Sequence, residues 1–198
     1  NLNLNIISQK INFNYFFKNL NLFNELLISR LFFKKNLYAE ININSDNIVK
    51  SKIFNKANLK INFQGGEINL NDSIFYSDKI GTLRFKNSKF IVDENQLLFE
   101  GNSKLNIKDL NYFYKLFLIP KQKRFEFNSI DFLFRINPKN GIIKIKKIIF
   151  YDKNNKIINL KLSENFLNEY SDDEFSYLNP IKFKNFLKKL LLNYADEG

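Results

Sequence analysis

The sequence ANLKINFQGGEINLN, residues 57–71, alternates apolar and polar side chains on both sides of a Gly-Gly pair. A strand with one dry face and one solvated face shows this period of two. Gly65 and Gly66 predict a tight turn between the two runs. Residues from about 56 to 76 are therefore expected to form a hairpin with an irregular far end.

The same alternation recurs along most of the chain, in residues 2–6, 37–44, 83–92, 97–107, 130–136 and 143–151, with a further strand expected at 157–162. Turn residues at 93–95 and 137–141 separate the later runs. We therefore expect a mainly β (β-rich α+β) fold in which a curved antiparallel sheet of hairpins forms a groove or half-barrel. Because a slip of one residue would turn a strand's apolar set into water, one face is expected to carry the apolar side chains of Leu59, Ile61, Phe63, Ile68, Leu70, Phe99, Leu105, Ile107, Phe132, Phe134 and Ile136.

Three helical segments interrupt the strands. Asp109 is expected to cap a short helix near 109–118 that Pro120 ends. Residues 22–33 are apolar nearly all round, but they are too few for a membrane span. A C-terminal helix is expected from Pro180 to Tyr194, where a lysine-flanked apolar stripe comprises Phe183, Phe186, Leu187, Leu190 and Tyr194. We expect this helix to cap the sheet; lying on an anionic membrane is the alternative.

These patterns divide the chain into four parts. Residues 1–36 are interpreted as a strand and helical segment that end a preceding repeat, and residues 37–162 as the β-groove domain. Residues 163–178 are interpreted as a mobile acidic linker, and residues 179–198 as the capping helix. The chain contains no Met, so we expect it to be part of a longer protein.

The composition narrows the possible chemistry. Cys, His and Trp are absent, which leaves no thiol nucleophile, no imidazole base and no metal site of the usual Cys or His type. The phosphate-binding loops of nucleotide enzymes are absent too. We predict a non-enzymatic domain without metal or cofactor; a pair of carboxylates for glycoside cleavage stays open as an alternative, although nothing in the sequence selects a pair.

The net charge of +11 suggests an anionic partner. Arginine, which reads phosphates and bases by bidentate geometry, occurs at only four separated positions, and the lysines are spread along the whole chain. We therefore expect a solvated lysine-rich surface and no nucleic-acid partner. A basic β-domain that binds a polyanion, either nucleic acid or an anionic membrane surface, is the alternative.

Several segments together resemble the C-terminal part of AsmA-like proteins. They are the Asn-rich alternating strands, the helix DLNYFY at 109–114 ending near Pro120, the hairpin through Asn137-Pro138, and the closing stretch from Ile181 to Ala195. The resemblance implies a repeating β-groove in the periplasm, anchored in the inner membrane through a segment outside this chain. It also implies a role in phospholipid transport and outer-membrane assembly (envelope biogenesis), with phospholipid acyl chains and the rest of its own longer chain as partners. It brings no catalytic residues.

Overall fold

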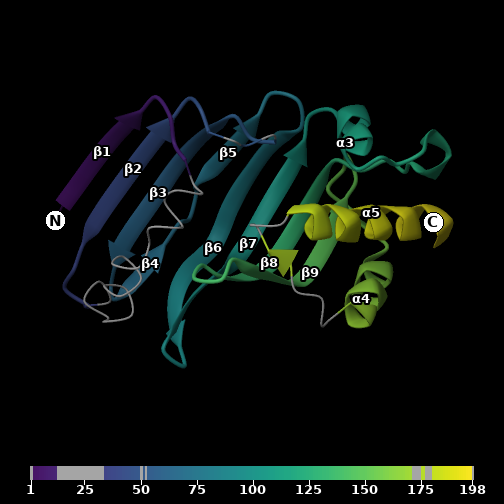
Figure 1. The fold of residues 1–198 in the computed structure, drawn as a ribbon. Coiled ribbons are helices and arrows are strands. Elements are labelled where there is room, and N and C mark those ends of the chain that lie inside the picture. Colours follow the sequence, from purple (N-terminus) through teal and green to yellow (C-terminus); the bar gives the residue numbers. More distant parts are fainter. Residues whose placement is uncertain are drawn as a thin grey trace.

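The computed structural model describes residues 2–12, 34–49, 51, 53–170, 175–176 and 180–197. This part of the chain is mainly β, as expected, and its strands form one 11-stranded sheet (Figure 1). The strands are β1 (Leu2–Ser8), β2 (Ala39–Ser45), β3 (Lys56–Gln64), β4 (Glu67–Asn69), β5 (Ile74–Ser77), β6 (Gly81–Asp93), β7 (Gln96–Ile107), β8 (Ser129–Asn137), β9 (Ile142–Tyr151), β10 (Ile157–Ile158) and β11 (Phe175–Ser176). The helices are α3 (Leu110–Leu116), the 3-10 helix η2 (Lys121–Lys123), α4 (Leu160–Glu169) and α5 (Pro180–Glu197).

The strands follow the order β1-β2-β3-β4-β6-β7-β8-β9-β10, with β5 pairing β3 and β6, and β11 pairing β9. All of these pairs are antiparallel except β1 with β2, which run parallel. The sheet is therefore mixed, and the expected antiparallel pairing does not extend to this end. Residues 9–38 separate the two strands, and only a connection of that length allows a parallel crossover. β1 therefore joins the same sheet as β2, across the boundary expected after residue 36.

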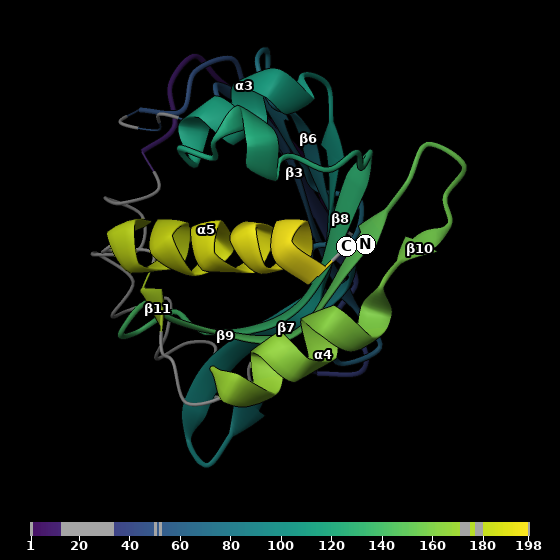
Figure 2. The same ribbon diagram turned by 90° about the vertical axis from the view of Figure 1, so that its right-hand side faces the viewer.

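The strand registers place the alternating apolar residues on one face of the sheet. Phe63 of β3 lies opposite Ala39 of β2 on one side and Ile68 of β4 on the other. Further along the sheet, Phe99 of β7 lies opposite both Phe90 of β6 and Ile136 of β8. Figure 2 shows that the sheet curls around α5, with α3 and α5 on its concave side. The apolar residues therefore line the concave face, and the Asn and Lys side chains lie on the convex face.

A bulge in β6 contributes to this curvature. The β6–β7 register shifts between Lys86 and Lys89, and Asn87 adopts a positive φ of 46°. Bulges bend a strand and increase its local twist. Gly101 of β7 lies directly against this irregularity, because an added Cβ would be only 2.4 Å from the Cα of Ser88.

The main core lies between β7, β8 and β9 and the helices. The rings of Phe125, Phe150 and Tyr194 join a loop, the sheet and α5, with centroids 4.7–5.1 Å apart between Tyr194 and the two phenylalanines. The buried members of this cluster are Ile80, Leu105, Phe113, Tyr114, Phe117, Ile119, Phe127, Ile130, Phe132, Ile148, Phe150, Leu162, Phe166, Phe175, Phe186, Leu187, Leu190, Leu191 and Tyr194. At this end the concave face is a closed core.

Two of the expected helices are confirmed. The Asp109 carboxylate accepts a hydrogen bond from the Tyr112 N–H at 2.8 Å and caps α3. In α5, Phe186, Leu187, Leu190 and Tyr194 are buried and Phe183 is half-buried, so the apolar stripe packs on the sheet. The expected helix at 22–33 lies outside the described residues.

The interpretation of residues 160–170 is wrong. The strand expected at 157–162 stops after Ile158, and α4 occupies Leu160–Glu169, where the sequence suggested strand and then linker. The Asn159 side chain accepts from the Leu162 N–H and caps the helix, while Leu162 and Phe166 turn one face into the core. The acidic side chains of Glu164 and Glu169 are exposed, so they lie on the solvent-facing side of this helix.

Candidate functional site

Among the described residues, no helix packs on the apolar side chains at the β1 end of the concave face. Leu2, Leu4 and Ile6 of β1 are 60%, 42% and 38% exposed. Their neighbours on β2 and β3 are half-buried, and the register puts them on the same face. We call this set the N-terminal apolar surface; it comprises Leu2, Leu4, Ile6, Ala39, Ile41, Ile43 and Ile61.

This surface is continuous across three strands. Leu4 lies beside Ile41, and Ile41 lies beside Ile61; Ile6 and Ile43 form the next row. Small clusters border the surface, one around Phe63, Ile68 and Leu97 and one around Ile48, Ala57 and Leu59. In the part of the chain that the structure describes, no helix contributes to either cluster. An aliphatic surface of this kind can bind a flexible hydrocarbon chain without any directed polar contact.

Most of the residues expected to contact lipid are instead covered by protein. Leu105 and Phe132 belong to the core beneath the helices, whereas Leu59, Phe63 and Ile68 belong to the smaller clusters. Phe99 and Phe134 are buried against each other, with ring centroids 5.4 Å apart. The half-buried remainder is Ile61, Leu70, Ile107 and Ile136, of which only Ile61 lies on the N-terminal apolar surface. Lipid contact by these eleven residues stays a prediction.

Sequence reasoning missed the residues of β1 and β2 as site candidates. Leu2, Leu4 and Ile6 have the same alternation as the later strands, and so do Ala39, Ile41 and Ile43. Period two shows that one face is apolar, but it does not show which strands a helix will cover. The alternation in β1 and β2 was visible in the sequence. It points to an exposed apolar surface only once α5 is known to pack at the other end of the sheet.

Four basic residues of the convex face are paired with acids on neighbouring segments. Arg135 makes the closest pair, with 2.8 Å between its Nη2 and the Glu100 carboxylate, and it also lies 3.9 Å from Asp93. Lys89–Glu67, Arg84–Asp72 and Lys104–Asp131 are further pairs at 3.4–4.0 Å. Alternating charges of this kind stabilise strand pairing modestly. They also place negative charge beside these four cations.

Asp131 is the titratable group of this face with the most unusual environment. Burial raises the pKa of its carboxyl above the ordinary aspartate value, although nearby Lys104, Lys86 and the Tyr151 hydroxyl act in the opposite direction. The Lys104 ammonium lies 4.7 Å from the centre of the Tyr151 ring. Among the described side chains, no second carboxylate lies beside Asp131. The pair of carboxylates needed for glycoside cleavage is therefore not assembled at this position.

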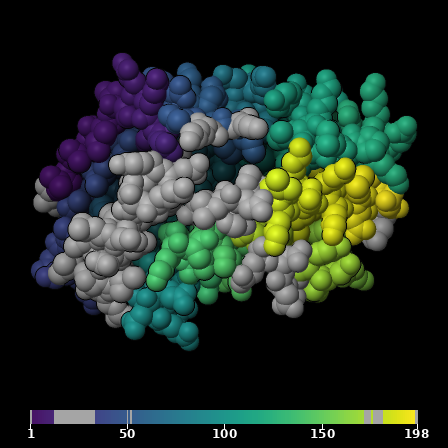
Figure 3. All heavy atoms as spheres, viewed as in Figure 1, coloured from purple at the N-terminus to yellow at the C-terminus, as the bar shows by residue number. Residues whose placement is uncertain are grey.

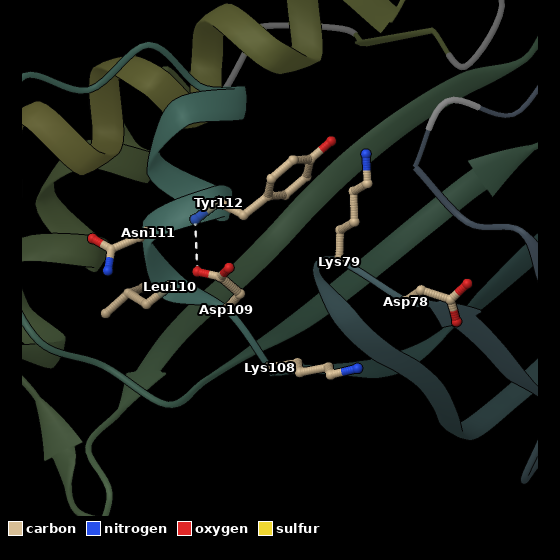
Figure 4. A pocket seen from close by; sticks show the side chains of 7 residues that line it. All are labelled: Asp78, Lys79, Lys108, Asp109, Leu110, Asn111 and Tyr112. Atoms are coloured by element: carbon tan, nitrogen blue, oxygen red, sulfur yellow. Dashed lines mark hydrogen bonds between the residues drawn. The ribbon is translucent and has the colours of Figure 1, made fainter.

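A polar hollow of about 740 Å³ lies beside the start of α3 (Figure 4). Its lining includes Asp78, Lys79, Lys108, Asp109 and Tyr112. Asp109 caps α3, the Asp78 carboxylate accepts a hydrogen bond from the side-chain amide of a neighbouring loop at 2.7 Å, and the Lys79 ammonium lies 5.3 Å from the centre of the Tyr112 ring. Asp78, Lys79 and Asp109 therefore already have partners within the structural framework.

The described residues contain no cluster of three acidic side chains that could hold a metal ion, and none of their helices combines the length and apolarity needed to cross a bilayer. Comparison with known proteins finds no matching family model, no matching curated protein and no matching solved structure.

Proposed function

We propose that this chain is a non-enzymatic lipid-handling domain that binds a phospholipid acyl chain on the N-terminal apolar surface. One observation carries the proposal: Leu2, Leu4 and Ile6 are exposed on the same concave face that is closed by helices elsewhere in the sheet. Exposed apolar area is unfavourable in water, at roughly 25 cal/mol per Å², and a bound hydrocarbon chain would cover part of it.

The shape and polarity of the surface support this ligand. Its seven side chains are all aliphatic, and the residues that alternate with them in the same strands are polar except for Ile7, which is 87% exposed on the other side of the sheet. The surface belongs to the same face of the sheet that curls around α5 (Figure 2), and a flexible chain can lie along it. The resemblance to AsmA-like proteins supports a periplasmic setting for this activity, within a longer chain anchored in the inner membrane.

The alternative, polyanion binding, has less support. The net charge of +11 favours an anionic partner. Four of the cations on the convex face, however, form ion pairs with carboxylates at nitrogen-to-oxygen distances of 2.8–4.0 Å. The two proposals differ in their response to salt. Binding through phosphates weakens steeply as salt rises, whereas burial of an acyl chain does not.

The test measures binding of a fluorescent, zwitterionic lysophospholipid to the purified chain by fluorescence titration. A zwitterionic headgroup is used so that the positive net charge does not itself drive binding. Ile43→Asp places a charge on the N-terminal apolar surface, and the matched control Asn44→Asp places the same charge one residue away on the exposed polar face. Circular dichroism and thermal unfolding check that each variant folds.

We expect Ile43→Asp to weaken binding at least tenfold, equivalent to about 1.4 kcal/mol, and Asn44→Asp to leave it nearly unchanged. Ile41→Thr, which keeps the β-branched shape and adds a hydroxyl, is the milder second variant. Equal affinities for Ile43→Asp and Asn44→Asp would refute the assignment of this surface. Loss of wild-type binding on adding salt would favour the polyanion alternative.

A further inference from the structure

The two edges of the sheet are finished differently. At one edge, the two-residue strands β10 and β11 pair with opposite ends of β9, and α4 lies against the same strand. At the other edge lies β1, seven residues long, which forms one end of the molecule in Figure 3, with α5 toward the other. Among the described residues only β2 is paired with β1.

Backbone N–H and C=O groups of β1 point away from β2, toward the open edge of the sheet. The Leu2 N–H donates to the Tyr38 carbonyl on the β2 side at 3.1 Å. Because successive residues of a strand direct their backbone groups to opposite sides, the N–H and C=O groups of Asn3 and Asn5 point toward the open edge. Natural edge strands are usually protected by lysine, proline or a bulge, and β1 contains none of these.

The sequence of β1 is complementary to itself. In an antiparallel pair with a two-fold axis at Leu4, Leu2 of one copy faces Ile6 of the other, and Leu4 faces Leu4. Asn3 and Asn5 then exchange backbone hydrogen bonds, and their side chains continue an amide row that begins with the 3.2 Å bond between Asn42 and Asn5. Since β1 carries no charge, two chains of +11 can meet here without placing like charges opposite each other.

We propose that the β1 edge binds a second copy of this chain by antiparallel strand pairing about Leu4. This pairing joins the two concave faces, so the N-terminal apolar surface of one copy continues into that of the other. The exposed side chains of Leu2, Leu4 and Ile6 gain apolar neighbours across the junction. The partner surface is thus an interface between two identical edges, closed by two-fold symmetry.

The first test uses the absence of cysteine in the chain. Leu4→Cys introduces a single thiol, and in a non-hydrogen-bonded antiparallel pair the two Cα atoms lie about 4.5 Å apart, within disulfide range. The control Ile157→Cys places a thiol at a similarly exposed apolar position on the opposite edge. Under mild oxidation at low micromolar concentration, we expect Leu4→Cys to form disulfide-linked dimers at least tenfold faster than Ile157→Cys.

The second test is sedimentation velocity of the 198-residue chain and of Asn3→Pro. Proline removes an N–H that points away from β2, so β1 can stay in the sheet while the outward ladder is broken. We expect a dimer for the wild-type chain and a monomer for Asn3→Pro, with lysophospholipid binding retained in both. A monomeric wild-type chain, a dimer that survives Asn3→Pro, or equal cross-linking rates of the two thiols would each overturn the proposal. None of these results bears on lipid binding, which Ile43→Asp tests without altering the backbone of β1.

Discussion

Replacing Leu190 with alanine tests whether α5 closes the concave face as part of the folded core. Leu190 is fully buried, at 0% exposure, among side chains of the sheet and of the other helices. The substitution removes three carbon atoms, which lose about 2.4 kcal/mol of transfer free energy at roughly 0.8 kcal/mol each. The cavity that remains adds to this cost, so we expect the free energy of unfolding to fall by about 3–4 kcal/mol.

For a chain of this length, each kcal/mol lowers the melting temperature by about 2–4 °C. Leu190→Ala should therefore melt roughly 6–16 °C lower in calorimetry or circular dichroism, in membrane-free buffer. Ile181→Ala is the matched control, because Ile181 is on the same helix but 66% exposed, and we expect a change within about 0.5 kcal/mol. If both variants unfold like the wild type while liposome binding is lost, the packing argument fails and α5 is a membrane-surface helix.

Three further predictions concern single contacts. Tyr194→Phe should lower the free energy of unfolding by about 1–3 kcal/mol in denaturant titration, because the lost hydroxyl bonds the Asn159 carbonyl at 3.0 Å and Ser163; an unchanged midpoint would contradict this. Gly101→Ala should lower the melting temperature, at a cost of about 1–3 kcal/mol, since its Cβ would be 2.4 Å from the Ser88 Cα; a melting temperature at or above that of the wild type would refute the close packing. Burial raises the folded-state pKa of Asp131, so its stabilising contribution is full below the ordinary aspartate pKa and is lost as pH rises through the raised value. Unfolding measured across this acidic range should show that loss in the wild type and not in Asp131→Asn, and identical pH profiles would argue against it.

Local patterns were sufficient for the elements whose signals are short in range. The hairpin of β3 and β4 follows from alternation around Gly65 and Gly66, and both glycines adopt the positive φ that such a turn requires. The β8–β9 hairpin and the capped helix α3 were predictable in the same way. In each case a residue within a few positions along the chain supplies the physical constraint.

The pattern reasoning failed at α4 because two signals competed. Ile157 and Ile158 do form a strand, but Asn159 then takes a left-handed backbone conformation and caps a helix. The spacing of Leu162 and Phe166 was a helical signal, and the acidic residues beside them made it easy to mistake for a linker. Contacts with β9 and α5 favour the helix over a linker, because they bury the apolar side of α4.

The amino-acid sequence was enough to predict a sheet with one mainly apolar and one mainly polar face, because side chains alternate along most of the strands. It also determined where the tight turns and helix caps lie, since these depend on neighbours in the chain. The parallel pairing of β1 with β2 and the position of α5 over β7–β9 depend instead on tertiary contacts. Both arrangements join segments far apart in sequence, and no local periodicity specifies which parts of an apolar face will be covered. The same alternation therefore makes a closed core at Phe132 and an exposed surface at Leu4.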